Sequence, residues 1–192
     1  MDIPHLLLAI FLGVSLAAST GLNTFLPLFL LSLAARFHLG GVALQGNFAW
    51  IASDPATIAL GIATSIEVIG DKVPSVDHAL DVFGTFVRPV FGAAAFAAAL
   101  GGLDLTTAAL IGLIVGAPLS LGVHSAKATT RVASSATTLG LGNPALSVVE
   151  DAASAGLSLT GIFAPLLVPL ALGLSIWGLI ATVKALRPRP RK

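Results

Sequence analysis

Long runs of apolar residues cover most of this chain, and short polar segments separate them. A helix that crosses the hydrocarbon core of a bilayer needs about 20 predominantly apolar residues. Apolar stretches of this character lie near residues 6–37, 55–70, 86–103, 105–123, 145–162 and 164–184. The pattern therefore predicts an all-α membrane protein with about six transmembrane helices.

The first stretch is too long for a single straight crossing. As one helix it would measure roughly 50 Å, against a hydrocarbon core of about 30 Å. Small and hydroxyl residues lie in its middle, from Ser19 to Asn23, and Pro27 follows. A second polar segment, from His124 to Arg131, interrupts the stretch that begins near Asp104. We expect both segments to break their helices, the first and the fourth.

After each predicted break comes a strong signal for a helix start. The signals are Ser53-Asp54-Pro55 and Gly142-Asn143-Pro144, where a capping side chain precedes proline at the first helical position. Both following helices carry polar residues at steps of three and four, which places them on one helix face. The two polar stripes are Thr57, Gly61, Thr64, Glu67 and Asp71, and Asn143, Ser147, Glu150, Asp151, Ser154 and Ser158.

The parallel order of these signals suggests an internal repeat. Residues 1–103 and 104–184 would each contain a broken helix, a helix with a polar stripe and an apolar closing helix. Two repeats of three crossings each must insert with opposite orientation, which is the inverted-repeat plan of many secondary transporters. We therefore predict a 3+3 inverted repeat.

The composition agrees with a membrane protein and gives an orientation. Hydrophobic residues make up 56% of the 192 residues and charged residues 10%, and cysteine is absent. No disulfide, thiolate metal site or cysteine nucleophile is therefore available. Half of all Lys and Arg lie in or next to the tail 185–192. By the positive-inside rule we expect the C-terminus on the cytoplasmic side of the inner (plasma) membrane. An even number of crossings places the N-terminus on the same side.

Few charged residues are left inside the apolar part of the chain, and they form two clusters in the sequence. An ionisable residue at membrane depth usually faces a partner or a cavity and marks a functional site. In the first cluster, Glu67 and Asp71 end a polar stripe and Arg88 follows in the next apolar stretch. Between them lie Asp77 and Asp81, four positions apart and hence on one helix face, with His78 beside them. Two carboxylates and an imidazole so placed allow binding of a divalent metal or relay of protons. Otherwise these acids pair with basic neighbours in a solvated loop.

The second cluster consists of three potentially cationic residues on one helix face, His124, Lys127 and Arg131. Like charges at this spacing repel unless a negative group lies opposite. Glu150 and Asp151 can supply that charge as a structural ion-pair network. Alternatively an anionic ligand does so, with help from nearby hydroxyls and the amide side chains of Asn23 and Asn143, which lie at the first break and at a helix start. The two readings are compatible if an internal acid holds the cations when no substrate is bound.

The same segments carry a resemblance to a known family. The chain resembles a bacterial membrane-protein family catalogued as domain of unknown function 4126, on five stretches: 21–28, 71–78, Arg88-Pro89, 124–131 and 142–151. The resemblance spans nearly the whole chain. It supports the choice of residues and implies no activity for them.

These features favour a small membrane transporter with its site near the bilayer midplane. We expect a small charged solute, anionic in sign, bound by Asn23, Arg88, His124, Lys127, Arg131 and Asn143. Proton or cation coupling would then fall to Glu67, Asp71, Glu150 and Asp151. The alternatives are a cation channel or divalent-metal permease, and a membrane-embedded metal-dependent enzyme that acts on a lipid phosphate.

The predicted partners are the lipid bilayer and the solute. We expect no nucleic-acid partner, because the formal net charge is only +1. We expect no cofactor other than a bound cation. The Gly- and Ala-rich segment 92–99 allows the close helix approach that is used in homodimers.

Overall fold

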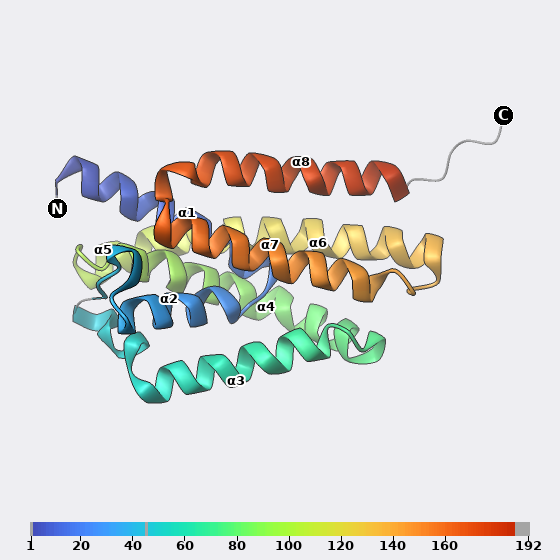
Figure 1. Ribbon diagram of the computed structural model, residues 1–192, viewed down its shortest axis with the longest axis horizontal. Helices are drawn as coiled ribbons and strands as arrows, with labels where there is room; N and C mark the ends of the chain where they lie inside the picture. Colours follow the sequence, from blue (N-terminus) through green and yellow to red (C-terminus); the bar gives the residue numbers. More distant parts are fainter. Residues whose placement is uncertain (1, 45, 187–192) are drawn as a thin grey trace.

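The computed structural model shows a bundle of helices that run roughly along one common axis (Figure 1). It describes residues 2–44 and 46–186. The elements in chain order are α1 (Ile3–Leu22), α2 (Leu26–Arg36), the short 3-10 turns η1 (Leu39–Gly41) and η2 (Gly46–Ala52), α3 (Asp54–Gly70), α4 (Pro74–Ala99), α5 (Leu105–Ile111), η3 (Gly112–Gly116), α6 (Ala117–Thr138), α7 (Asn143–Phe163), η4 (Pro165–Leu167) and α8 (Val168–Leu186).

The first apolar stretch breaks where the sequence predicts and then reverses direction. Helix α1 ends at Leu22, and the side chain of Asn23 caps α2 by accepting a hydrogen bond from the Leu26 N–H at 3.1 Å. Pro27, in the first turn of α2, has no N–H to satisfy. Because His5 and Gly40 line the same cavity, the start of α1 and the end of α2 lie at one end of the bundle. The two helices form a hairpin whose tip lies inside the bundle (Figure 1).

The predicted break from His124 to Arg131 is wrong. Helix α6 passes through this segment without interruption, and together with α5 and η3 it forms one 34-residue helix, Leu105–Thr138. The hydroxyls of Ser125, Thr129 and Thr130 donate to carbonyls one turn earlier in the same helix, so they do not compete with its backbone hydrogen bonds. The only irregularity in this described helix is the π-helical turn η3, Gly112–Gly116.

Both predicted helix starts are confirmed. Helix α3 begins at Asp54 and α7 at Asn143, but the capping positions are held by Ser53 and Gly142 instead of Asp54 and Asn143, and of these two only Ser53 makes a side-chain cap hydrogen bond. Helix α4 begins earlier than the apolar stretch 86–103, at Pro74, and therefore includes Asp77 and Asp81.

Four helices in the described part of the chain are long and apolar enough to cross a membrane: Ile3–Leu22, Ala79–Ala99, Leu105–Thr138 and Asn143–Phe163. Two further apolar helical segments in the described part are shorter, Leu26–Arg36 and Pro165–Gly178. Helix α1 begins and α8 ends at opposite ends of the bundle (Figure 1). The number of crossings and the side of the membrane on which each terminus lies remain predictions. The tail at 187–192 lies outside the described residues.

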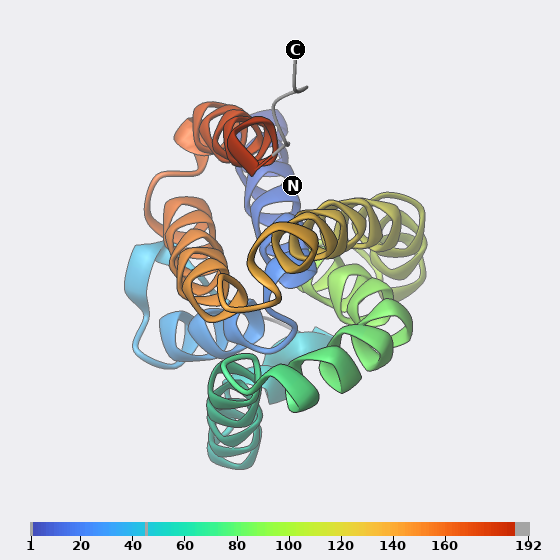
Figure 2. The same ribbon diagram turned by 90° about the vertical axis from the view of Figure 1, so that its right-hand side faces the viewer.

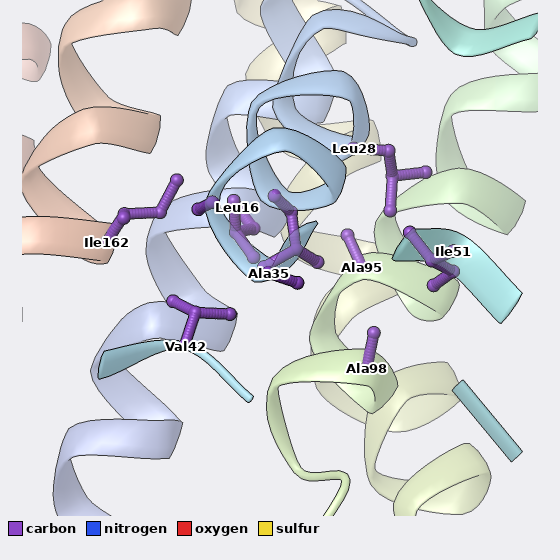
Figure 3. Packing of buried hydrophobic residues seen from close by; sticks show 10 residues of the cluster. Leu16, Leu28, Ala35, Val42, Ile51, Ala95, Ala98 and Ile162 are labelled. Atoms are coloured by element: carbon purple, nitrogen blue, oxygen red, sulfur yellow. The ribbon is translucent and has the colours of Figure 1, made fainter. Parts of the chain in front are cut away.

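Helix α1 lies at the centre of the bundle and contacts α4, α6 and α7 (Figure 2). An apolar core fills the end of the bundle where α1 begins. Figure 3 shows its members converging from α1, α2, α4, α7 and the η1–η2 segment: Leu16, Leu28, Ala35, Val42, Ile51, Ala95, Ala98 and Ile162. The opposite half of the bundle contains most of the described charged residues.

Helices α4 and η3–α6 cross at glycines, and this close approach gives a testable prediction. A Cβ atom added at Gly92 would lie 2.9 Å from the Gly116 carbonyl oxygen and against the Ser120 side chain. We expect Gly92→Ala to lower the free energy of unfolding by about 1–3 kcal/mol, because the two backbones must separate. The measurement is thermal unfolding in detergent.

Gly122→Ala is the matched control. Its added Cβ meets nothing within 4 Å, and the position is helical. We expect this change to be neutral or to stabilise by up to about 1 kcal/mol. Equal effects of the two substitutions would contradict the close crossing of α4 and α6.

Candidate functional site

Ten charged side chains from four helices and one turn meet around the tip of the α1–α2 hairpin. This charged cluster consists of Glu67, Asp71, Lys72, Asp77, Asp81, Arg88, Lys127, Arg131, Glu150 and Asp151. It contains six of the nine acidic residues of the chain. The cluster extends from the α3–α4 turn, which contains Asp71 and Lys72, to Arg88, about 21 Å by helix rise from the start of α4.

The helix break binds one carboxylate of the cluster directly. Glu67, at the end of α3, accepts hydrogen bonds from the Thr24 N–H at 2.9 Å, the Thr24 hydroxyl at 2.8 Å and the Phe25 N–H at 3.2 Å. These amides belong to the start of α2, where free N–H groups and the helix dipole favour a negative charge. The Glu67 residue is 3% exposed. The break at Asn23 is therefore stabilised by a residue 44 positions later in the chain.

Arg88 neutralises Glu67 from the other side. Its guanidinium, which is fully buried, donates to Glu67 Oε1 at 3.2 Å and to the Gly21 carbonyl at the end of α1 at 3.2 Å. It also donates to Nδ1 of His124. Since a guanidinium has no acceptor, Nδ1 must be unprotonated, and Nε2–H then donates to the Thr85 hydroxyl at 3.1 Å. His124 is thus held here as the neutral imidazole.

Lys127 bridges the end of α1 and two acids. Its ammonium donates to the Leu22 carbonyl at 2.9 Å and to Asp71 Oδ2 at 3.1 Å, and it lies 3.3 Å from Glu150 Oε2. The Leu22 carbonyl is one of those left free at the C-terminal end of α1, where the helix dipole favours a positive charge. The side chain of Lys127 is fully buried.

Arg131, one turn further along α6, is surrounded by acids. Its Nη2 donates to Glu150 at 2.5 Å and lies 3.5 Å from Asp71 Oδ2. Its Nη1 pairs with Asp77 and lies 3.6 Å from Asp81 Oδ2. The predicted neutralisation of Lys127 and Arg131 by Glu150 is therefore present, and α3 and α4 supply three further carboxylates.

A more exposed pair closes the cluster at one edge. Lys72 lies 2.8 Å from Asp151, and the side chain of Asn23 donates to the other oxygen of Asp151 at 3.1 Å. The side chains of Lys72 and Asp151 are 36% and 17% exposed. Asp151 therefore faces the hairpin tip and its counter-ion is Lys72, whereas the sequence suggested Lys127 and Arg131.

The cluster contains more acids than bases. Against six carboxylates it has four basic side chains, namely Lys72, Arg88, Lys127 and Arg131. Asp71 is 2% exposed, and its Oδ1 has no hydrogen-bond partner among the described residues, although Oδ2 accepts from Lys127. An unpaired buried carboxylate is costly, so excess negative charge is relieved by bound protons or cations. Asp77 Oδ1 and Asp81 Oδ1 also lack a hydrogen-bond partner among the described residues, but each lies within ion-pair distance of an arginine, whereas Asp71 Oδ1 has no such contact there.

The structure brings most of the predicted site residues together, but separates Asn143 from them. Asn143 starts α7, and its amide contacts Ser135 at 3.1 Å, roughly 10 Å by helix rise from Glu150. Asp77 and Asp81 share one face of α4, as predicted, and lie close to Arg131 and Arg88. Among the described residues, no group of three or more acidic or histidine side chains is arranged to hold a metal ion. The side chain of His78 lies outside the described part.

Sequence reasoning missed three participants. Thr24 donates a hydrogen bond to Glu67, and Thr85 forms one with His124. Lys72 forms an ion pair with Asp151. The position of Thr24 directly after Asn23 was a usable signal, because the free N–H groups of a new helix lie there. No feature of the sequence predicts the contact between Thr85 and His124.

Comparison with known proteins gives one match. Residues 10–185 match the family described as domain of unknown function (DUF4126). No curated protein and no solved structure matches the chain.

Proposed function

The chain belongs to the family of domain of unknown function DUF4126, and from its charged cluster we propose that it is a small membrane transporter that couples a charged solute to protons. One observation carries this proposal: Lys127 and Arg131 are buried cations held only by internal carboxylates and a carbonyl, in a network with more acids than bases. Buried ionisable groups at membrane depth are costly and mark substrate or proton pathways.

The geometry supports an anionic solute that competes with the internal acids. When Asp71 and Glu150 are ionised, they neutralise Lys127 and Arg131 and leave no place for an anion. Protonation of these two acids removes their charges and frees Lys127, and it leaves Arg131 paired only with Asp77 and Asp81 through Nη1. Lys127 and the released Nη2 of Arg131 can then bind phosphate or a carboxylate through charge-assisted hydrogen bonds. Release of the solute restores the internal pairs and favours loss of the protons. Solute and proton therefore bind together.

Transport by this cluster does not require the predicted inverted relation between residues 1–103 and 104–184. A hairpin tip that ends inside the bundle already gives two free helix ends at one place, as the broken helices of many transporters do. The inverted relation remains a prediction. The two halves differ in one respect: α2 reverses direction after α1, whereas α5, η3 and α6 form one continuous helix.

The excess of carboxylates also favours a second candidate, a cation permease. In that case Asp71 and its neighbours would bind a cation, and the basic residues would be structural counter-ions. Both candidates use the same side chains and differ in the sign of the solute.

A flux assay in proteoliposomes with an internal pH dye tests the proposal. The panel contains phosphate, small carboxylates, metal cations and a pH gradient alone. We expect one anion to acidify the lumen as it enters. Arg36→Gln, which removes a base that pairs with exposed Asp54 outside the cluster, serves as the control and should keep the flux. Cation flux without an anion would support the permease, and flux no greater than in protein-free vesicles would contradict both candidates.

A further inference from the structure

A line of serine side chains connects the charged cluster with a cavity at the other end of the bundle. It lies where α1 and α7 pack together in opposite directions. We call it the hydroxyl seam, and it consists of Ser15, Ser19, Ser154 and Ser158. All four residues are fully buried.

The contacts between α1 and α7 follow one continuous register. Starting at the cluster, the amide of Asn23 donates to Asp151 at 3.1 Å. One turn away, the Ser154 hydroxyl donates to the Ser19 carbonyl at 3.0 Å. After a further turn the Ser15 hydroxyl donates to the Leu157 carbonyl. The seam therefore starts at the side chain of Asp151, at the edge of the cluster.

At its other end the seam reaches a cavity. A Cβ atom added at Gly161 would lie 2.8 Å from the Ser15 hydroxyl and 3.4 Å from Leu12. Both Gly161 and Leu12 line a cavity of about 340 Å³ that also includes His5 and Gly41. Ten residues of α7 separate Asp151 from Gly161, which corresponds to about 15 Å. The seam thus covers the part of the bundle between cluster and cavity.

Two of the four hydroxyls have no protein partner. The oxygens Ser19 Oγ and Ser158 Oγ are buried and lack a hydrogen bond within the described part of the chain. Serine in a helix can donate to the carbonyl one turn earlier, as Ser125 does, but these two do not. A buried hydroxyl without a partner is costly, and in proteins such groups are usually satisfied by ordered water. Close packing of small residues accounts for Ser15 and Ser154, which bond across the interface, but leaves the other two hydroxyls unexplained.

We propose that the hydroxyl seam holds a chain of water molecules that gives protons a route between the cavity and the cluster. This inference deepens the proposed function, because it supplies the route for the coupled proton. Each water or hydroxyl accepts a proton on one side and releases one on the other, so the chain itself is unchanged after each transfer. The charged and titratable groups at its ends are Asp151 with Lys72 at the cluster and His5 with Asp2 at the cavity.

Cysteine labelling tests the hydration directly, because the chain has no cysteine of its own. Ser19→Cys and Ser158→Cys each introduce one thiol into the seam. The control is Ala17→Cys, also fully buried on α1 but packed in an apolar cluster with Phe96 and Leu100. A small methanethiosulfonate reagent reacts with the thiolate, which forms only where water is present.

We expect both seam cysteines to react at least about tenfold faster than Ala17→Cys in folded protein. All three should react fully after unfolding, and unchanged gel-filtration and thermal profiles would confirm that each variant folds. Seam cysteines that react no faster than Ala17→Cys would overturn the inference.

A second variant tests the role in proton movement. Ser158→Val removes a hydroxyl and fills space in the seam, and should slow proton flux in proteoliposomes at least about tenfold. Unchanged flux would overturn the proton route even if the seam is hydrated. A wild-type protein without any proton flux would instead contradict the proposed function and exclude the proton route, while the labelling would still report whether water is present.

Discussion

Arg88→Met is expected to destabilise the bundle by about 3–5 kcal/mol, the largest effect on stability among these predictions. The substitution removes the only cation that contacts Glu67 in the described structure, and leaves that carboxylate buried without a counter-ion. It also leaves the Gly21 carbonyl without the hydrogen bond from Arg88. Thermal unfolding in detergent measures the effect.

A double variant separates the ion pair from other contributions of Arg88. Adding Glu67→Gln to Arg88→Met removes both charges and should recover much of the lost stability. Arg36→Met, which breaks an exposed pair with Asp54, should cost less than about 1 kcal/mol. A single Arg88 variant as stable as the wild type, or a double variant no more stable than the single one, would contradict the buried pair.

The largest effect on transport is expected from Lys127→Met combined with Glu150→Gln. The pair of changes removes one cation and one of the acids that hold it, so the charge balance of the cluster is kept and the protein should fold. If Lys127 binds the solute, flux should still fall roughly 10- to 100-fold, because a charge-assisted hydrogen bond of about 1.5–3 kcal/mol is lost.

The result is scored separately for unfolding temperature and for solute flux. Lys127→Met alone should be less stable than the double variant, since it leaves Asp71 and Glu150 with fewer counter-charges. Restored stability together with wild-type flux would show that Lys127 is only part of a structural ion-pair network.

The sequence was sufficient to predict the first helix break and most of the cluster. Asn23 followed by Pro27 stops one helix and starts another by local chemistry, so no distant contact is needed to predict the break. The scarcity of charges in an apolar chain likewise identified Glu67, Arg88 and Lys127, because such residues must find partners inside the protein.

The other features of the fold and the cluster depend on contacts between residues that are distant in the sequence, or on local conformations that more than one structure would fit. The reversal of α2 depends on Glu67, which holds the hairpin tip from another helix. Hydroxyl residues near Thr129 resembled a break but bond their own helix, and no proline or glycine lies between His124 and Arg131 to interrupt it. The spacing of Asp77 and Asp81 predicted their shared helix face, but the approach of Arg131 to them cannot be read from the sequence.

The central claim is that a buried carboxylate of the cluster binds the proton that moves with the solute. The most direct measurement is the number of protons carried per solute molecule, in proteoliposomes with an internal pH dye, for the wild type and for Asp71→Asn. This variant keeps the shape of the side chain, and Lys127 and Arg131 remain paired with Glu150. The matched control is Asp54→Asn, at an exposed acid far from the cluster.

We predict that the wild type and the control carry protons with the solute, whereas folded Asp71→Asn carries few or none. An unchanged proton-to-solute ratio in Asp71→Asn would contradict the assignment of the proton to this carboxylate.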